Sequence, residues 1–474
     1  MRIAIFCHRW MGLAFCLLFA WWFVSGLFMM YADFPGVTAA DRLAHAWPLN
    51  AGSVRFPPDR ARSDSARLRM FDGRPAYVYG NGEIVYADTG EKQQGFPRDL
   101  NLRTAAAWVR QPAGLAAVEQ LTDADQWTVE GTFRKFRPLL KCSWPDGQQV
   151  YVSERTGEVV QYTTARSRFF AYLGPIPHWL YFLPFRKHLQ LWTNVVIAAS
   201  GLASVAALLG LLVGLSLYWP AKRVPYRGPK RLHTLLGLFF GVMACTWSFS
   251  GMMSMDPFHL ERDGELPSFR ADPAALESFA ARPPAEALRL LRGWAVKELE
   301  FTSFDGEPVY VAYGESGQSR IVPVNGAPAE KFEASRMERV IRAMLPAGET
   351  QEIRTLTQYD LYYLDRERRR PLPVLLVQMR NGSRYYVDPR TAKVEGNYSP
   401  QGWVTRYLYH GLHSLDLPWL YNHRPAWDLL VIALLLGGVA LAATSILLGF
   451  RVVARTFRPA SVARRKAAGF ALRS

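Results

Sequence analysis

Six of the nine histidines form three pairs at repeated spacings, and imidazole is a side chain that binds transition metals. One pair is separated by 225 residues, and the other two are separated by 235 residues each. The pairs are His8 with His233, His178 with His413, and His188 with His423. Each histidine lies in or near a long apolar segment, where a titratable side chain is costly unless it has a partner. These six residues are therefore the candidate cofactor ligands.

Four apolar segments are expected to position these histidines. No charged residue occurs between Arg9 and Asp33, from Leu189 to Ala221, from Leu232 to Met255, or from Leu429 to Phe450. Each segment reaches the roughly 18 to 20 residues that a helix needs to cross a bilayer. The sequence therefore predicts four transmembrane helices. A cleaved signal peptide is the alternative for the first segment, but its apolar run is longer than the usual signal-peptide core.

The distribution of basic residues predicts which way the helices point. The chain carries a net charge of +16, and the loop 222–231 and the tail 451–474 are rich in Lys and Arg and contain no acidic residue. By the positive-inside rule both segments are cytoplasmic, so the excess charge requires no nucleic-acid partner. We expect a protein of the bacterial inner membrane with both termini in the cytoplasm. The expected parts are 1–32 (N-terminus and first span), 33–187 (first periplasmic region), 188–221 (second span), 222–231 (basic loop), 232–255 (third span), 256–428 (second periplasmic region), 429–450 (fourth span) and 451–474 (basic tail).

The two halves of the chain match each other, which indicates an internal duplication. The offset of 225 also aligns Trp22 with Trp247 and the pair Ser25-Gly26 with the pair Ser250-Gly251. Two helix–region–helix units that both start in the cytoplasm form a parallel repeat about an axis along the membrane normal. We therefore expect a four-helix transmembrane bundle of 2+2 design, with equivalent residues facing each other across the axis.

The two periplasmic regions show a smaller pattern of their own. Alternating runs with turn residues predict hairpins at 76–90, 149–162, 308–324 and 383–396. Helical patterns at Pro284–Leu299 and Ala334–Met344 precede two of them, so we predict small α+β modules, two per half. Cys142 is the only cysteine in these regions, which excludes a disulfide framework.

The sequence resembles the PepSY-associated transmembrane family. The resemblance lies in HRWMGL at His8, the two Ser-Gly pairs, hairpins of the type YVSERTGEVV, and the segments IPHWLYFLPFRKH and YHGLHSLDLPWLYNHRPAWD. It implies an inner-membrane protein with periplasmic PepSY modules, often linked to iron uptake. Some members are similar to di-haem reductases of ferric siderophores.

A bis-histidine haem needs two neutral imidazoles that approach iron from opposite sides, each oriented through its second ring nitrogen. Paired helices related by a twofold axis supply that geometry. We expect two non-covalent haem b groups: one between His8 and His233 near the cytoplasmic face, and one near the outer face. For the outer group the pair His178 and His413 competes with the pair His188 and His423.

Other interpretations of the histidines remain open at this point. The imidazoles can serve as interfacial groups bonded to backbone or lipid, and the same residues can form a zinc or copper site. Trp and Tyr near the span ends are interpreted as interfacial anchors, and the glycines of the spans as packing positions. His45, His259 and His410 lack a histidine counterpart and are interpreted as surface or loop residues.

The leading hypothesis is a transmembrane metal reductase that passes electrons to a periplasmic ferric siderophore or similar metal chelate. No dinucleotide-binding motif is present, so the donor would be a membrane quinol or a cytoplasmic reductase. The alternative is a non-catalytic PepSY membrane module that binds a peptide, a protease or another periplasmic partner. A transporter is disfavoured because the spans contain no Asp, Glu, Lys or Arg.

Overall fold

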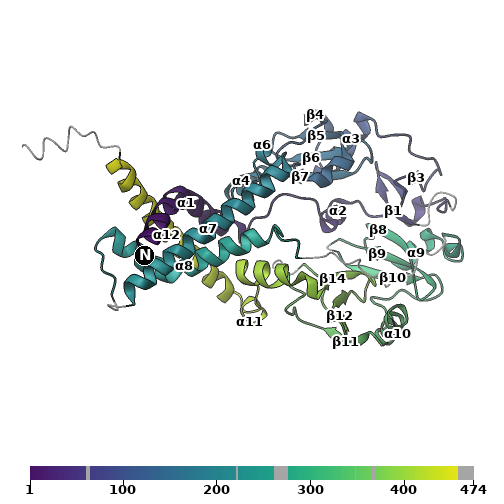
Figure 1. The fold of residues 1–474 in the computed structure, drawn as a ribbon. Coiled ribbons are helices and arrows are strands. Elements are labelled where there is room, and N and C mark those ends of the chain that lie inside the picture. The colour runs from purple at the N-terminus through teal and green to yellow at the C-terminus, as the bar shows by residue number, and fades with distance from the viewer. Residues whose placement is uncertain are drawn as a thin grey trace, which may run out of the picture. The chain divides into compact units, whose positions relative to one another are not determined.

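The computed structural model describes residues 1–59, 65–219, 223–260, 276–315, 317–346, 348–365 and 369–456. The chain divides into two compact units, whose elements are labelled in Figure 1. The first, here called the helical unit, comprises Met1–Asp33, Phe170–Glu261 and Trp403–Ser474. The second, here called the sheet unit, comprises Phe34–Phe169 and Arg262–Gly402. Lys222 of the predicted basic loop and the tail beyond Thr456 lie outside the described residues.

Four long helices form the frame of the helical unit. They are α1 (Arg2–Met29), α7 (Leu189–Tyr218), α8 (Pro229–Met253) and α12 (Ala426–Thr456). The shortest has 25 residues, and at 1.5 Å per residue it spans about 37 Å, which exceeds the ~30 Å of a hydrocarbon core. All four are long and apolar enough to cross a membrane. The four predicted spans are thereby confirmed, and the chain is a multi-pass membrane protein.

The helices α7 and α12 each pack against both α1 and α8. Between α1 and α8, the rings of Phe23 and Trp247 lie 6.0 Å apart. Gly438 on α12 makes this approach possible, because a Cβ atom there would lie 2.5 Å from the ring of Phe23. Gly437 beside it leaves the same kind of space for the ring of Phe240. Small residues thus let aromatic rings enter the bundle, as is common between membrane helices.

Short helices flank the outer ends of the spans. Before α7 the chain forms α4 (Ala165–Leu173), α5 (Pro175–Trp179) and α6 (Leu183–Arg186). Before α12 it forms a π-helix, η6 (Val404–His413), and then α11 (Pro418–Tyr421). A π-helix is rare and frequently occurs at functional sites. These elements carry His178 and His413.

Three antiparallel sheets form the sheet unit. The central sheet has the order β10-β9-β8-β1-β2-β3, so strands from both halves of the sequence pair within it. Its strands are β1 (Ala66–Phe71), β2 (Arg74–Tyr79), β3 (Ile84–Tyr86), β8 (Glu298–Phe304), β9 (Glu307–Tyr313) and β10 (Ser319–Pro323). The other two sheets have the orders β4-β5-β6-β7 and β11-β12-β13-β14. Their strands are β4 (Ala117–Leu121), β5 (Leu139–Ser143), β6 (Gln149–Ser153), β7 (Val159–Thr163), β11 (Thr350–Leu356), β12 (Val374–Met379), β13 (Arg384–Val387) and β14 (Val394–Tyr398).

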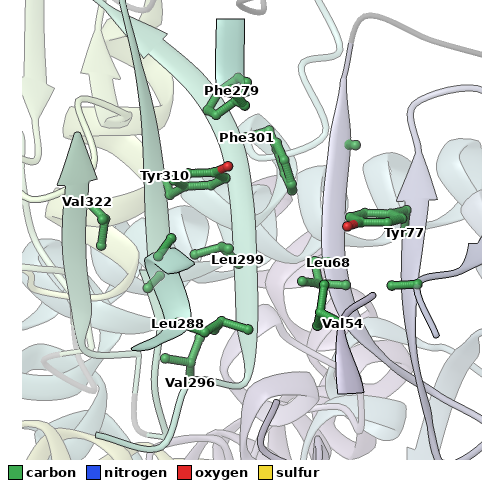
Figure 2. Close-up of a cluster of buried hydrophobic side chains, with 14 of the residues drawn as sticks. Val54, Leu68, Tyr77, Phe279, Leu288, Val296, Leu299, Phe301, Tyr310 and Val322 are labelled. Atoms are coloured by element: carbon green, nitrogen blue, oxygen red, sulfur yellow. The ribbon is translucent and has the colours of Figure 1, made fainter. Parts of the chain in front are cut away.

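The core of the central sheet is built from residues of both halves (Figure 2). Tyr77 on β2 and Tyr310 on β9 are fully buried, and Phe301 on β8 contacts the rings of both. Leu68 on β1 faces Leu299 on β8 in the ladder that joins the halves. The described helices of this unit are α2 (Ala39–His45), α3 (Arg98–Val109), α9 (Pro284–Leu290) and α10 (Ala334–Met344).

The four predicted hairpins are all present, as β2-β3, β6-β7, β9-β10 and β13-β14. The helix predicted at Ala334–Met344 is also confirmed. The helix predicted at Pro284–Leu299 is wrong in its second half, because α9 ends at Leu290 and β8 begins at Glu298. Gly293 lies between them at a φ of 86°, a backbone conformation that an α-helix cannot contain.

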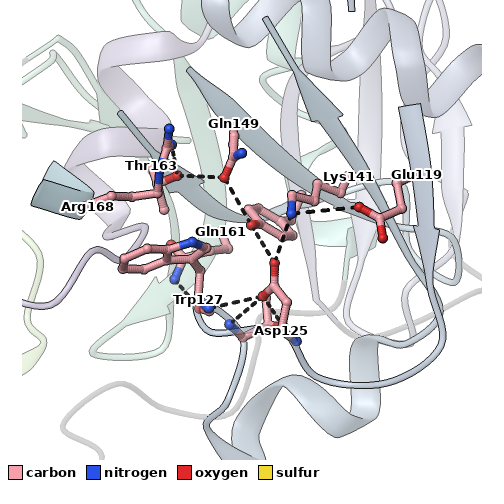
Figure 3. Close-up of polar contacts among 10 residues, drawn as sticks. Glu119, Asp125, Trp127, Lys141, Gln149, Gln161, Thr163 and Arg168 are labelled. Atoms are coloured by element: carbon pink, nitrogen blue, oxygen red, sulfur yellow. Dashed lines mark hydrogen bonds and ion pairs between the residues drawn. The ribbon is translucent and has the colours of Figure 1, made fainter. Parts of the chain in front are cut away.

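A buried carboxylate fixes an equivalent turn beside each of the two smaller sheets. Asp125 accepts hydrogen bonds from the backbone N–H of Trp127 at 3.0 Å and from the hydroxyl of Tyr151 at 2.7 Å (Figure 3). In the other sheet Asp360 accepts one from the hydroxyl of Tyr386 at 3.0 Å. Burial, and then the nearby carboxylate, raise the pKa of both tyrosines, so each hydroxyl stays protonated and donates.

Candidate functional site

The structure brings the first candidate pair together. His8 lies on α1 and His233 lies on α8, and their ring centroids are 6.2 Å apart with 29° between the ring planes. Both side chains are partly buried. The two residues are 225 positions apart in sequence, so only the packing of the helices makes them neighbours.

Each of these two rings is held through Nδ1. The Nδ1 atom of His8 lies 3.0 Å from the carbonyl oxygen of Ala206 on α7, and a carbonyl only accepts, so Nδ1–H is the donor. The Nδ1 atom of His233 lies 3.1 Å from Oγ1 of Thr444 on α12. That hydroxyl donates its own hydrogen to the carbonyl of Leu441 at 2.7 Å, so it accepts from His233. In both rings this tautomer leaves the Nε2 lone pair available for a metal.

Gly210 on α7 supplies the space that the His8 ring occupies. A Cβ atom at this position would lie 2.5 Å from Cε1 and 3.0 Å from Nδ1 of His8. Any other residue would therefore displace the ring or the helix.

The second pair that the structure brings together is His178 and His413. His178 lies on α5, and His413 is the last residue of the π-helix η6. Their ring centroids are 5.9 Å apart, and the planes are inclined by 74°. The inclination differs clearly from that of His8 and His233.

Serine hydroxyls hold this second pair, again through Nδ1. Oγ of Ser25 lies 3.0 Å from Nδ1 of His178, and Oγ of Ser250 lies 3.1 Å from Nδ1 of His413. Both hydroxyls also donate to a carbonyl of their own helix, so each accepts from the imidazole. Nδ1 of His413 is also 3.1 Å from the carbonyl oxygen of Trp247, which can only accept. All four imidazoles thus share one tautomer.

Two tryptophans attach the outer segments to the spans. The indole Nε1–H of Trp22 on α1 donates to the carbonyl of His178 at 3.1 Å. The indole of Trp247 on α8 donates in the same way to the carbonyl of Leu412, next to His413, at 3.0 Å. The backbone of each outer histidine segment is therefore fixed to the helix that also supplies its serine.

The separations of the ring centroids suit a metal held between two imidazoles. A metal–nitrogen bond measures about 2 Å, and an imidazole nitrogen lies roughly 1 Å from its ring centre, so two opposed ligands place their centroids about 6 Å apart. Both observed separations agree with this value. Within the described part of the chain, no group of three or more His, Cys, Asp or Glu residues could hold a metal ion. Two donors per site fit an iron porphyrin, whose ring supplies the other four, better than zinc or copper.

The pair His188 and His423 is not brought together in this way. His188 is the residue before α7 and is exposed. His423 is also exposed, and its Nδ1 is bonded to the carbonyl of Trp419 at 2.6 Å. Among the described residues, no ring contact joins the two histidines, which distinguishes them from the other pairs.

The two histidine pairs lie far apart along the bundle. His8 and Ser25, which contacts His178, are 17 residues apart on α1, or about 25 Å at the rise of an α-helix. The Phe23 and Trp247 rings lie in this interval on α1 and α8. The geometry therefore offers two separate sites rather than one.

Sequence reasoning did not identify the residues that orient the histidines. Ser25, Ser250, Trp22 and Trp247 were visible as matched positions, and that match was the available signal. Thr444 and Gly210 gave no such signal, because their counterparts at the same offset differ in type. His410, interpreted as a loop residue, contacts the carboxylate of Asp416 at 3.3 Å on the π-helix side of the site.

Comparison with known proteins gives one result at the level of the family. A search among curated proteins finds no significant match. The sequence does match the description "PepSY-associated TM region" over residues 6–347, which is more than half of the chain. The matched range includes His8, His178 and His233 and most of both sequence regions of the sheet unit. The chain therefore belongs to the PepSY-associated transmembrane family.

Proposed function

We propose that this protein transfers electrons across the inner membrane through two haem b groups, each held by a pair of histidines. His8 and His233 would hold one group, and His178 and His413 the other. The observation that carries the proposal is the placement of both pairs at about 6 Å with Nδ1 of every ring bonded to the protein. Haem b supplies one-electron redox chemistry when bound. The protein's part is to fix the ligands, exclude water and separate the two sites.

The proposed orientation places the His8 site near the cytoplasm. Arg2 and Arg9 flank His8, and Lys230 and Arg231 precede His233, as the positive-inside rule requires of cytoplasmic helix ends. Electrons would enter from a quinol or a cytoplasmic reductase and leave at the His178 site on the periplasmic side.

The proposed architecture is a duplication with PepSY modules. Two contacts that repeat in both halves support it: Ser25–His178 matches Ser250–His413, and Trp22 and Trp247 donate to corresponding segments. In the sheet unit, the turn Phe71-Asp72-Gly73 recurs as Phe304-Asp305-Gly306, with φ values of 48° and 74° in the first and 56° and 75° in the second.

The proposed substrate is a ferric siderophore or a similar metal chelate in the periplasm. This part of the proposal rests on the family's link to iron uptake and on coordination chemistry. Hard oxygen donors hold ferric iron more tightly than the softer ferrous ion, so reduction would loosen the chelate.

Absorption spectroscopy tests the haem proposal directly. Purified protein should show a Soret band that shifts on reduction with dithionite, and a pyridine haemochrome assay should count two haems per chain. The double variant His8→Ala/His233→Ala should retain one haem. The matched control His188→Ala/His423→Ala should retain two. Colourless wild-type protein would reject the proposal and leave a membrane-anchored binding module.

A further inference from the structure

The two histidine pairs share their centroid separation but differ in the relative orientation of their rings. The planes of His8 and His233 are inclined by only 29°, whereas those of His178 and His413 are inclined by 74°. A twofold relation between the halves does not require this difference. Each pair has its own inclination, and the packing around the rings must set it.

The packing around His413 has no equivalent at His178. The ring of Tyr409 stacks on the ring of His413, with centroids 5.5 Å apart and planes inclined by 23°. At the offset of 235 residues the counterpart of Tyr409 is Gly174, which has no side chain to stack on His178. Tyr409 belongs to the π-helix, whose wider turn has no counterpart before α7. Tyr409 thus aligns one ring of the outer pair and leaves the other to Ser25.

The packing around His8 favours the near-parallel arrangement. The ring lies over the backbone of Gly210 and donates to the carbonyl of Ala206. His233 is held from the other side by Thr444, with the hydroxyl of Ser445 at 3.5 Å. Helix backbone on one side and two hydroxyls on the other restrict rotation of these two rings.

Ring orientation matters for iron because imidazole donates π-electron density perpendicular to its own plane. Two parallel rings donate into the same iron d orbital, which splits the d levels and stabilises the ferric state. Two crossed rings donate into different orbitals, which keeps the levels nearly degenerate and favours reduction. Axial ligands and their hydrogen bonds are the main means by which a protein sets a haem potential.

On the basis of the proposed haem function, we propose that the two sites differ in reduction potential, with the inner site lower and the outer site higher. Tyr409 is a positioning residue that creates the difference by crossing the outer rings. One electron that leaves the inner iron, oxidising it, reduces the outer iron, so the transfer balances without a proton. The direction of flow toward the His178 site is therefore built into the ring geometry.

Electron paramagnetic resonance of the oxidised full-length protein tests this inference. We expect two low-spin ferric signals: a rhombic signal from the near-parallel site and a strongly anisotropic signal with a large maximal g value from the crossed site. His8→Ala/His233→Ala should remove only the rhombic signal. In a potentiometric titration followed by absorption, the site that survives in that variant should be the one reduced first in the wild type.

Substitutions at Tyr409 separate positioning from mere stability. Tyr409→Leu should convert the strongly anisotropic signal toward the rhombic type and lower the potential of the outer site, while the haem count stays at two. Tyr409→Phe keeps the ring and should restore the wild-type signal and potential. Two signals of one type, or an unchanged signal in Tyr409→Leu, would overturn the inference while the haem proposal stands. Absence of any low-spin signal and of a Soret band would instead reject the haem proposal itself.

Discussion

Hydroxyl and carbonyl oxygens determine which nitrogen of each imidazole remains available. A free imidazole exchanges between two tautomers, and only a fixed acceptor at Nδ1 selects the one whose Nε2 can bind a metal. The chain uses a carbonyl for His8, a threonine for His233 and a serine for each of His178 and His413. The orientation of the candidate ligands therefore depends on small residues that do no chemistry themselves.

Gly210 offers the sharpest test of the His8 position. In Gly210→Val the Cβ atom would lie 2.5 Å from the His8 ring, so the ring must leave its place and the inner site should lose its haem. We expect the pyridine haemochrome count to fall from two to one. Gly214→Ala on the same helix is the control, because its Cβ would meet only the flexible end of Leu238 at 3.2 Å. Retention of two haems in Gly210→Val would show that His8 is not held where the structure places it.

Cys142 is a residue whose reactivity the structure predicts. It is fully buried on β5, and burial raises the pKa of its thiol to about 12. Because the thiolate is the reactive form, a maleimide should not label Cys142 between pH 7 and 9 in the native protein. Labelling should appear when the protein is unfolded in denaturant. In Cys142→Ser, the denaturant-dependent labelling should fall by the share of one of the four cysteines. Rapid native labelling at position 142 would contradict the packing of this sheet.

At the scale of the elements, the joint between β1 and β8 carries opposite charges in register. Arg67 pairs with Glu300 and Arg69 pairs with Glu298, so one strand presents basic side chains and the other acidic ones. The charges are also inverted in the flanking contacts, because Arg69 binds Glu158 at 2.6 Å whereas Glu300 binds Lys393 at 3.0 Å. Opposite charges across a ladder stabilise it, and like charges destabilise it. The inversion favours pairing of unlike strands over pairing of two copies of the same strand.

A double-mutant cycle on the full-length protein tests this joint. Arg67→Glu and Glu300→Arg should each lower the free energy of unfolding by about 1 kcal/mol, since each places like charges opposite one another. The double variant should recover part of that loss, because opposite charges again face each other. Thermal unfolding monitored by intrinsic fluorescence measures the coupling. The exposed pair Arg342 and Glu338 on α10 is the control, where exchange should couple by only about 0.3 kcal/mol. Equal coupling at both sites would show that the joint contributes no specificity.

Sequence patterns predicted the elements well where periodicity and length alone decide them. The four spans and the four hairpins are of this kind, because apolar length and strict alternation are local signals. The strand β8 was assigned in part to a helix, since its burial depends on the distant partners β1 and β9. The π-helix that carries His413 also had no local signal. Choice between His178 and His188 was beyond the sequence for the same reason: both matched equally well, and only tertiary packing separates them.

At the scale of the whole molecule, two sites about 25 Å apart along the bundle have a consequence that one site would not have. An isolated site can exchange electrons only with partners on its own side of the membrane. Two sites in series connect the two sides, provided that neither is lost. The helical unit contains both sites, so α1 alone links the His8 position to the serine that holds His178.

Reconstitution into sealed vesicles tests the connection between the sites. With a soluble electron donor trapped inside vesicles in which the basic ends face inward, the wild type should reduce an external ferric hydroxamate chelate, followed by capture of ferrous iron with a chromogenic chelator. His8→Ala/His233→Ala should abolish this reduction although the outer haem remains, because the electron cannot cross the missing step. The same variant should still reduce the chelate when a membrane-impermeant donor is supplied on the outer side. His188→Ala/His423→Ala should behave as the wild type in both assays. Undiminished transfer from the inside in the His8/His233 variant would mean that electrons bypass this pair, and the serial arrangement would then have to be abandoned even if both haems are bound.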